Sequence, residues 1–503
     1  MKKYLYGASV QGIQGFIFQT NALKEIAGAS EIVEQICTSA FAEAINKDAQ
    51  QLTNDPNAIV TAAGNIKYVF DSEDKCRDLV KLFPMKIMEF APGITISQAV
   101  VCIEDGKAIG KEHIDLLEKK LRTQRNKPFR PYDLGLMGVN RSRKTGLPAY
   151  EEKKIKGTWT IIDKGVAKKL EREPGRVAKS FFGESNLRKI PLDMADITDS
   201  KGNGYSWLAV IHADGNNLGM IIQQLADKVE HVSGNEFINT FRTFSVALNA
   251  ATIIAANLAY KETLKEINLV DELKLPFRPI VIGGDDLTVI CRADLALTFG
   301  KLFLEFFERE TQAQLSALDF EFLKGGLTAC AGIAYIKASY PFHYGYHFAE
   351  ALCAHAKKEA KVGLGVDEPT PSCIQFHKVQ DSFVENYDAI RERELIAGTK
   401  RFDYGPYYLH ANGKPSIEKL QENVALFNGR EGNAVKSHLR QWLTDLHSNE
   451  ELAEQKINRL ISAATNPTQE ILKKLGLPQN ATDNNPTPVY DWLTINSINQ
   501  GGN

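Results

Sequence analysis

Hydrophobic and polar positions form a hairpin pattern around residue 284. Mostly apolar runs at 279–282 and 287–290 flank the sequence Gly283-Gly284-Asp285-Asp286. This pattern predicts two β-strands joined by a tight turn, where glycine allows positive φ and leaves room for a bulky ligand. Two carboxylates beside buried strands are costly unless they bind cations, and Mg²⁺ prefers such oxygen ligands. The segment is therefore either a metal-binding hairpin or an ordinary acidic one.

A second apolar strand ends in an acid. Residues 207–213 lead to Asp214, then to a turn rich in glycine and asparagine and a helix that starts near Met220. We expect the backbone N–H groups of the turn and the helix N-terminus to face an anionic ligand. A capping role for Asp214 is the alternative, and it is compatible with metal binding.

The spacing of these acids suggests a kind of chemistry. An acid at a strand end, followed about 70 residues later by a Gly-Gly-Asp-Asp hairpin, is the layout of a palm-type nucleotidyltransferase or cyclase. In such sites two metal ions clamp the attacking and leaving oxygens.

A third segment fits the same site. Residues 326–335 are small and apolar and predict a buried strand, and a loop at 340–343 precedes a helix that ends in Lys357 and Lys358. A lysine at this place is able to reach a triphosphate as a point charge. The alternative is a solvated lysine pair that the helix dipole stabilises.

Residues 205–365 resemble the second palm domain of the large subunit of type III CRISPR effector complexes, the CRISPR polymerase family. The matching stretches are 213–219, Gly283-Gly284-Asp285-Asp286, 331–334, 340–342 and Ala356-Lys357. The segments 9–18 and 23–32 resemble the first palm domain of that family, and 401–409 its link into a C-terminal helical domain.

The resemblance implies an α+β fold of two ferredoxin-like, nucleotidyl cyclase-like palm domains and a C-terminal helical domain. We expect a degenerate first palm at 1–130, a basic connector at 131–200, a catalytic second palm at 201–378 and helices at 379–503. The implied activity joins ATP molecules 3′ to 5′ into cyclic oligoadenylate second messengers for antiviral defence.

The resemblance also assigns roles in the second palm. Asp214, Asp285 and Asp286 would be catalytic and hold two Mg²⁺ or Mn²⁺ ions. The nucleotide and its phosphates would contact Gly215, Asn216, Asn217, Leu218, Gly283, Gly284 and Lys357. The implied partners are ATP, other type III subunits with guide and target RNA, and a separate ligand-gated effector for the product.

The first palm reads as a divergent internal repeat. Ser9 takes the place of Asp214, and Ala63-Gly64-Asn65 takes the place of Gly-Gly-Asp, so both carboxylate positions lack an acid. This copy is then either an acceptor pocket across a pseudo-two-fold interface or only a packing partner. The candidates for the pocket are Ser9, Gln11, Gly12, Gln14, Gly64 and Asn65.

Two features depart from the family pattern. No His-Asp doublet occurs in the sequence, so we expect no HD nuclease domain. Residues 141–149 look like a zinc knuckle that has lost its cysteines, and the seven cysteines form no CxxC pair, so we expect no zinc. Cysteines inside apolar runs fit a reducing cytoplasm.

Composition is that of an ordinary globular protein. The 503 residues are 43% hydrophobic and 24% charged with a net charge of −2, which gives no global attraction to nucleic acid. Basic stretches at 119–130 and 153–189 form either an RNA-contacting surface or a solvated connector.

Residues 244–260 come closest to a membrane span, but we interpret them as a buried helix because Asn249 and Asn257 interrupt the apolar run. Helical patterns follow residue 410, and we expect the last five residues, Asn499-Gln500-Gly501-Gly502-Asn503, to be disordered.

The same motifs also bear on other functions. A diguanylate cyclase motif would continue with Glu-Phe, whereas Asp286-Leu287 follow here. A template-dependent polymerase lacks support because no fingers or thumb pattern is evident. A stand-alone defence polymerase, an enzyme that joins ATP to S-adenosylmethionine, and a nucleotide- or RNA-binding scaffold remain alternatives.

Overall fold

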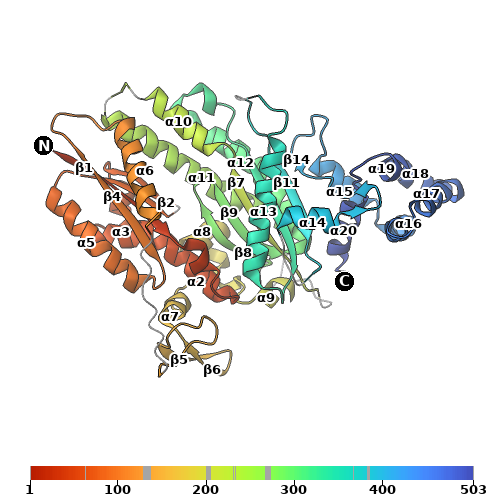
Figure 1. Ribbon diagram of the computed structural model, residues 1–503, viewed down its shortest axis with the longest axis horizontal. Helices are drawn as coiled ribbons and strands as arrows, with labels where there is room; N and C mark the ends of the chain where they lie inside the picture. The colour runs from red at the N-terminus through yellow and green to blue at the C-terminus, as the bar shows by residue number, and fades with distance from the viewer. Residues whose placement is uncertain are drawn as a thin grey trace.

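The computed structural model describes most of the chain and consists of two sheets, their helices and a terminal helical bundle (Figure 1). The described residues are 2–62, 64–127, 138–199, 205–229, 231–232, 234–266, 274–365, 368–381 and 386–501. The first sheet lies at the N-terminal end of the long axis, the second sheet at the centre, and the C-terminal helices at the other end. This arrangement confirms the predicted α+β fold.

The first sheet has four strands in the order β2-β3-β1-β4. All of its pairings are antiparallel. Its strands are β1 (Lys3–Gln11), β2 (Ala58–Ala62), β3 (Asn65–Phe70) and β4 (Thr95–Ile103). Its helices are α1 (Ile13–Ile17), α2 (Leu23–Gln35), the π-helix η1 (Ile36–Ala40), α3 (Phe41–Ala44), α4 (Ala49–Thr53), α5 (Glu73–Phe90) and α6 (Lys111–Arg125).

The second sheet has six strands in the order β14-β11-β10-β7-β9-β8. These strands are β7 (Trp207–Gly215), β8 (Phe277–Gly283), β9 (Asp286–Arg292), β10 (Ala329–Lys337), β11 (Cys373–Lys378) and β14 (Tyr407–Tyr408). The accompanying helices are α10 (Leu218–Lys228), α11 (Gly234–Glu266), η3 (Ala293–Leu295), α12 (Ala296–Leu315), η4 (Ser316–Leu318), η5 (Glu321–Leu323) and α13 (Phe342–Ala360).

Helices cover both faces of the second sheet. A Cβ on Gly332 of β10 would lie 2.0 Å from the Ala349 carbonyl oxygen of α13. A Cβ on Gly300 of α12 would lie 3.4 Å from Ile333 Cδ1 on the same strand. Since successive strand residues point to opposite faces, α13 and α12 pack on opposite sides of β10.

The two sheets repeat one topology, with β1, β2, β3 and β4 corresponding to β7, β8, β9 and β10. Ser9 pairs with Asn65 and Ala8 with Ile66, as Ala213 pairs with Leu287. Ser9 therefore takes the place of Asp214, as predicted. The predicted alignment of the hairpins is off by one residue, because Ala62 pairs with Asn65 where Gly283 pairs with Asp286. Gly64 thus corresponds to Asp285 and Asn65 to Asp286, while Ala63 lies outside the described residues.

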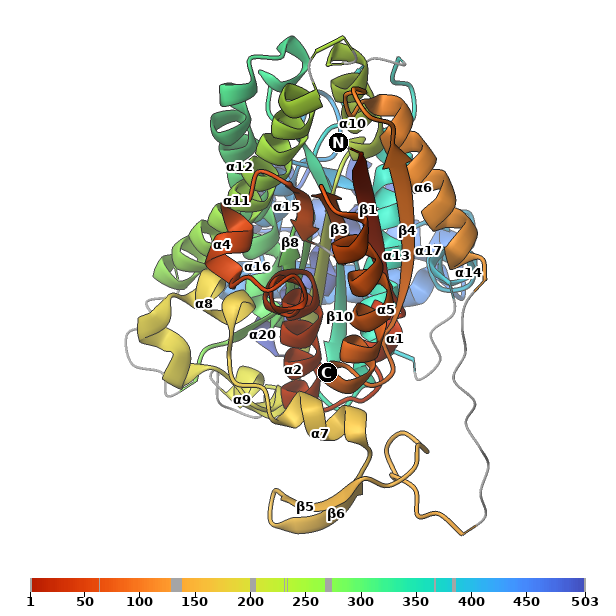
Figure 2. The ribbon, with the colours of Figure 1, turned by 90° about the vertical axis from the view of Figure 1, so that its left-hand side faces the viewer.

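The connector between the sheets contains a two-stranded hairpin that stands away from the body of the protein (Figure 2). Its elements are β5 (Glu151–Ile155), β6 (Thr158–Ile162), α7 (Lys164–Leu170), α8 (Arg176–Phe182), η2 (Glu184–Lys189) and α9 (Met194–Asp199). The knuckle-like segment is a loop closed by a bridge between Arg141 and Pro148.

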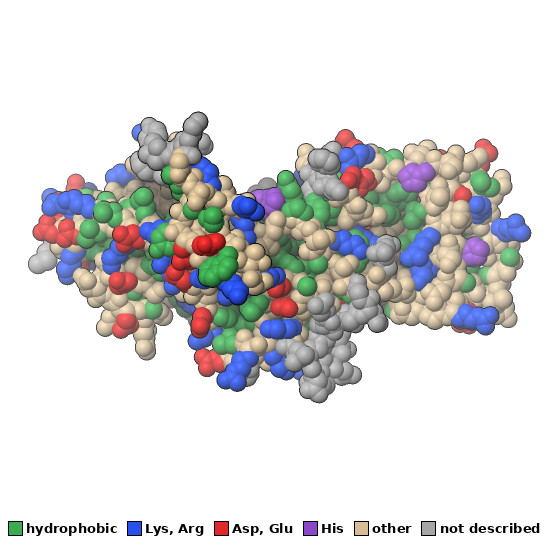
Figure 3. Space-filling view, turned by 90° about the horizontal axis from the view of Figure 1, so that it is seen from below, with side chains coloured by type: hydrophobic (Ala, Val, Ile, Leu, Met, Phe, Trp, Pro, Cys, Tyr) green, Lys and Arg blue, Asp and Glu red, His purple; other side chains and the backbone are tan. Residues whose placement is uncertain are grey.

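Some basic residues of this connector make hydrogen bonds and ion pairs within the protein. Lys169 of α7 is fully buried, and its ammonium group donates to the Phe16 carbonyl at 2.7 Å and to Gln19 Oε1 at 2.9 Å. Lys156 pairs with Asp193 at 2.7 Å. On the face seen in Figure 3, basic and acidic side chains are interspersed. The connector is therefore anchored to α1 and the residues that follow it, and the choice between an RNA-contacting surface and a solvated connector stays untested.

The C-terminal region is mainly helical, but its short strand β14 joins the second sheet, beyond the predicted end of that domain at residue 378. It contains α14 (Tyr387–Glu394), β12 (Ile396–Ala397), β13 (Lys400–Arg401), α15 (Ile417–Ala425), α16 (Gly429–Leu446), α17 (Glu450–Ala463), α18 (Asn466–Lys474), α19 (Gln479–Thr482) and α20 (Val489–Gln500). The expectation of a disordered end is wrong for Asn499 and Gln500, which belong to α20, whereas Gly502 and Asn503 lie outside the described residues. Tyr205 donates its hydroxyl to the Ile498 carbonyl at 3.0 Å, which ties α20 to the second sheet.

Helix α11 is long and apolar. An 18-residue window within Gly234–Lys265 has a mean hydropathy of 1.3, so by length and composition alone it is able to cross a membrane. Half of that window is buried inside the protein, and Phe244, Leu248 and Tyr260 belong to the main hydrophobic core. These contacts favour the predicted reading of α11 as a core helix.

Candidate functional site

Three carboxylates meet where two neighbouring strands end. Asp214 is the penultimate residue of β7, Asp286 begins β9, and Asp285 lies in the turn before it. β7 and β9 are hydrogen-bonded neighbours with Ala213 opposite Leu287. One carboxylate oxygen from each aspartate lies within 4.8 Å of the others. The sequence prediction that these acids form one cluster is therefore met by the geometry.

The turn before Asp286 has two central residues, Gly284 and Asp285. Gly284 has a φ of 63°, and Asp285 is not among the residues with positive φ. This is the pattern of a type II′ hairpin turn, which places glycine at the first central position. The predicted hairpin is thus present, and the glycine is required by the backbone.

Gly215 leaves space for the second acid. A Cβ on Gly215 would lie 2.8 Å from Asp285 Cβ and 3.0 Å from Asp285 Oδ2. Any side chain at 215 would therefore push Asp285 away from Asp214.

Burial and mutual repulsion disfavour the ionised forms of two carboxylates in the cluster. Burial raises the pKa of Asp285 and of Asp286 well above the ordinary carboxyl range, and neighbouring carboxylates add to the effect. Asp214 contributes to the raised pKa of both residues. Clustered carboxylates that resist ionisation fit a site whose charge is balanced by a bound cation.

Lys357 supplies a positive charge at this point. Its ammonium group contacts Asp214 Oδ2 and donates to the Gly215 carbonyl at 2.7 Å. Lys357 lies in the last turn of α13 and its side chain is largely buried, whereas the neighbouring Lys358 is exposed. Of the two lysines noted in the sequence, Lys357 is the one at the site.

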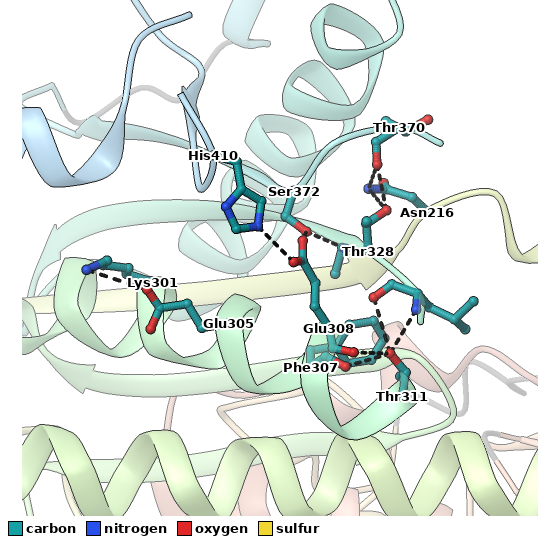
Figure 4. Close-up of polar contacts among 12 residues, drawn as sticks. Asn216, Lys301, Glu305, Phe307, Glu308, Thr311, Thr328, Thr370, Ser372 and His410 are labelled. Carbon is teal, nitrogen blue, oxygen red and sulfur yellow. Dashed lines mark hydrogen bonds and ion pairs between the residues drawn. The ribbon is translucent and has the colours of Figure 1, made fainter. Parts of the chain in front are cut away.

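The turn after β7 is held by its own hydrogen bonds. The Asn216 N–H donates to the Thr328 carbonyl at 2.8 Å, and its side-chain amide donates to Thr328 Oγ1 at 3.0 Å and to the Thr370 carbonyl at 3.3 Å (Figure 4). Asn217 has a φ of 58° and donates to Thr370 Oγ1 at 2.9 Å. Asn216 thus shapes the turn, and the phosphate contacts predicted for Asn217 and Leu218 stay predictions.

His212 is a neighbour of the site that the sequence analysis missed. It lies two residues before Asp214 on β7, so both side chains point to the same face. Its Nδ1 lies 3.1 Å from Thr288 Oγ1, and burial lowers its pKa, partly opposed by Asp214. The alternation of side chains along a strand could have identified His212, because it places this residue on the same face as Asp214.

The candidate acceptor residues of the first palm line the matching end of the first sheet. Gln11 donates to the Ser9 carbonyl and to Ser9 Oγ, each at 3.2 Å. Gly12 and Gly64 have φ values of 72° and 73°, and Asn65 begins β3. Ser9, Gln11, Gly64 and Asn65 therefore cluster, although no acid stands among them.

Gln14, a further acceptor-pocket candidate, contacts the second palm. It donates to Glu350 Oε1 at 3.0 Å and to the Tyr346 hydroxyl at 3.3 Å, both on α13. The Phe18 ring lies 4.1 Å from the Tyr346 ring between centroids. The helix that carries Lys357 is thus held by the first palm.

A cavity of about 180 Å³ lies between the two sheets. Residues of β2 and β8 both contribute to its wall, and it extends to the Gly-Gly turn. Its polar wall includes Thr38, Ser180, Arg242, Ser245 and Asn249, with Gly283 at one end.

Part of the chain matches a family model. Residues 207–363 match the model described as Cas10/Cmr2, second palm domain. Comparison with the curated proteins found no match.

Solved structures share the whole fold. The Csm1-Csm4 cassette in complex with cA4 aligns with a TM-score of 0.57 and 15% identity over 99% of this chain and 70% of the other. The cassette in complex with AMPPNP gives a TM-score of 0.53 and 14% identity over 100% and 70%. Csm1 from T. onnurineus gives a TM-score of 0.53 and 15% identity over 99% and 69%. The resemblance predicted from the motifs is confirmed by the family match and by the shared architecture.

Proposed function

We propose, taking residues 207–363 as a second palm domain of the Cas10/Cmr2 type, that this protein is a metal-dependent nucleotidyltransferase. Its product would be a cyclic oligoadenylate made from ATP, which would act as a second messenger in antiviral defence. The observation that carries the proposal is the convergence of Asp214, Asp285 and Asp286 within 4.8 Å at adjacent strand ends.

The donor set suits Mg²⁺ or Mn²⁺. All three side chains offer hard oxygen ligands, and burial together with mutual repulsion disfavours their ionised forms in the absence of a cation. Two divalent ions held here would polarise the α-phosphate and neutralise charge on the attacking and leaving oxygens.

Residues of the protein would orient the donor nucleotide. The Lys357 ammonium, now on Asp214, lies where it would exchange that carboxylate for a phosphate oxygen of the incoming triphosphate. Backbone N–H groups of Asn217 and Leu218, at the start of α10, would face the same phosphates. The cavity that ends at Gly283 would take the base, because its wall carries hydroxyl and amide groups.

The first palm would hold the acceptor nucleotide. Its strand ends carry Ser9 and Asn65 where the second palm has Asp214 and Asp286, so it offers neutral polar groups and no metal ligands. A 3′-hydroxyl placed at this end would attack the donor's α-phosphate, with pyrophosphate leaving.

Solved neighbours support the substrate and the setting. Csm1-Csm4 cassettes have been crystallised with one ATP, with AMPPNP and with cA4. We therefore propose ATP as the nucleotide and a Csm4-like subunit as a partner in a cytoplasmic, RNA-guided complex. The product would act on a separate ligand-gated effector.

The test is product formation from each nucleoside triphosphate with Mg²⁺ or Mn²⁺, resolved by mass spectrometry. The protein is assayed alone and within its complex with guide and target RNA. Asp285→Ala/Asp286→Ala is compared with Glu151→Ala/Glu152→Ala, which removes two adjacent exposed acids from β5. We expect 3′–5′ linked adenylates from the wild type and the β5 variant only. Full turnover by the aspartate variant, or no product in either setting, would overturn the proposal.

A further inference from the structure

Helix α11 carries polar residues within an apolar sequence, and two of them bind the catalytic turn. The Gly284 N–H donates to Asn249 Oδ1 at 3.2 Å. Thr252 Oγ1 donates to the Gly284 carbonyl at 2.6 Å. Asn249 and Thr252 are three residues apart and so lie on one face of the helix. Both polar groups of one glycine are therefore held by one helix.

Gly284 has no partner for these groups within the hairpin ladder. The pairing of β8 with β9 ends at Gly283 and Asp286, so Gly284 and Asp285 form the turn itself. A backbone N–H and C=O at such a tip would otherwise bind water. The contacts with α11 thus anchor the tip to a long core helix.

The Thr252 contact also selects the orientation of one peptide. Type I′ and II′ turns both have positive φ at the first central residue and differ by rotation of the peptide that follows. That peptide joins the Gly284 carbonyl to the Asp285 N–H, and the two groups of a trans peptide point in opposite directions. A carbonyl held toward α11 therefore directs the Asp285 N–H, and the start of its side chain, away from α11.

A second buried threonine of α11 shows that a threonine hydroxyl in this helix does not require a partner outside it. Thr263 is also fully buried, and its hydroxyl donates to the Ala259 carbonyl at 2.7 Å within the helix. Thr252 Oγ1 lies 3.0 Å from the equivalent Leu248 carbonyl and 2.6 Å from the Gly284 carbonyl, so its single proton is shared and the shorter contact is the one to the turn. A threonine in this helix is thus satisfied without a partner outside it.

We propose that Asn249 and Thr252 are positioning residues that lock the Gly284–Asp285 peptide so that Asp285 and Asp286 face Asp214. The inference deepens the proposed function, on which its kinetic part rests. Its physical basis is that a metal site needs its carboxylates fixed by groups that do not themselves touch the ion. Asn249 also borders the cavity between the sheets, so it links the wall of that cavity to the turn.

Matched pairs of substitutions in one helix test this role. Thr252→Val removes the hydroxyl but keeps the shape, Thr252→Ser restores a hydroxyl, and Thr263→Val makes the same change away from the turn. Asn249→Ala is compared with Asn257→Ala, because Asn257 donates to the Phe181 carbonyl at 2.7 Å and not to the turn. Thermal unfolding of all five proteins shows whether they fold.

The first readouts do not depend on catalysis. We expect Thr252→Val and Asn249→Ala to weaken Mn²⁺ binding ~10-fold, as loss of supporting contacts does at other metal sites, measured by calorimetry on the nucleotide-free protein. We also expect faster hydrogen exchange in a peptide that covers 280–288. Thr252→Ser, Thr263→Val and Asn257→Ala should retain Mn²⁺ affinity and exchange within about twofold of the wild type.

Kinetics then separate positioning from folding. With ATP, kcat should fall ~10²-fold in Thr252→Val with little change in KM, since a misplaced ligand affects the transition state most. Equal Mn²⁺ affinity and exchange in Thr252→Val and Thr263→Val would overturn the proposal. If the wild type makes no product, the proposed function fails, whereas the Mn²⁺ and exchange measurements still decide the role of Asn249 and Thr252.

Discussion

Gly215 and Asp285 lie so close that a Cβ at position 215 would fall 2.8 Å from the Asp285 Cβ. The contact joins the end of β7 to the turn between β8 and β9 and brings the second carboxylate toward Asp214. Gly215 therefore has a steric role in the proposed metal site, because its lack of a side chain leaves room for Asp285.

Gly215→Ala should displace Asp285 and weaken the metal site. A methyl group at 2.8 Å forces a shift because the contacted atom is close to the backbone of the hairpin. We expect a ~10- to 100-fold loss of turnover and of Mn²⁺ affinity, measured by product assay and calorimetry. The control is Gly219→Ala on α10, where a Cβ meets nothing within 4 Å. Equal activity in the two variants would contradict this account.

Lys357→Ala should change metal and nucleotide binding in opposite directions. Removal of the ammonium group frees the Asp214 carboxylate and lowers the positive charge near the cluster, so free protein should bind Mn²⁺ more tightly. The triphosphate loses a cation, so kcat/KM for ATP should fall ~10- to 100-fold. Calorimetry and steady-state kinetics give the two values. Lys358→Ala changes an exposed neighbour and should leave both values unchanged. Weaker Mn²⁺ binding in Lys357→Ala would contradict the idea that Lys357 and the metal ion compete for Asp214.

The sequence predicted the parts of the site that depend on local pattern. The hairpin at 283–286, the acid at the end of β7 and the lysine at the end of α13 follow from strand alternation, glycine turns and helix period. Their meeting at one sheet end required the strand order, which was expected from the family resemblance. These features were predictable because they depend on local sequence or on the strand order of the family that the chain resembles.

Tertiary contacts account for what the sequence analysis missed. Asn249 read as an interruption of an apolar helix, yet its partner Gly284 is 35 residues away. The contact of Gln14 with Glu350 across the two palms was not foreseen, and the acceptor-pocket role of Gln14 stays a prediction. The predicted alignment of the hairpin in the first palm with the hairpin in the second was off by one residue. The correct alignment depends on the pairing of Ala62 with Asn65, and no sequence motif indicates that pairing. Asn499 and Gln500 were expected to be disordered, and they instead continue α20, whose Trp492 is buried.

Asn21→Ala should destabilise the joint between the palms. Asn21 Oδ1 accepts the Phe342 N–H at 3.1 Å, so a residue of the first palm caps the N-terminus of α13. Loss of a cap costs ~1 kcal/mol, which should lower the thermal midpoint slightly and raise hydrogen exchange in the first turn of α13. Asn428→Ala is a matched control, because Asn428 precedes α16 without a side-chain cap bond. Greater destabilisation in the control variant would contradict the cap.

Asp491→Asn should remove a pH dependence of stability. Asp491 lies buried on α20, its Oδ2 accepts the Tyr407 hydroxyl at 2.7 Å, and burial raises its carboxyl pKa to about 7. A carboxyl whose folded pKa is raised destabilises the folded state as pH rises from its ordinary pKa near ~4 toward the folded value. The wild type should therefore lose stability between roughly pH 4 and 7 relative to the variant, by an order of 1–3 kcal/mol, and the difference should stay constant above pH 7. Asparagine keeps an oxygen for the Tyr407 hydroxyl, so the comparison isolates the charge. Thermal midpoints of the wild type, Asp491→Asn and the exposed Asp483→Asn across this range provide the measurement, and parallel curves for all three would contradict the assignment.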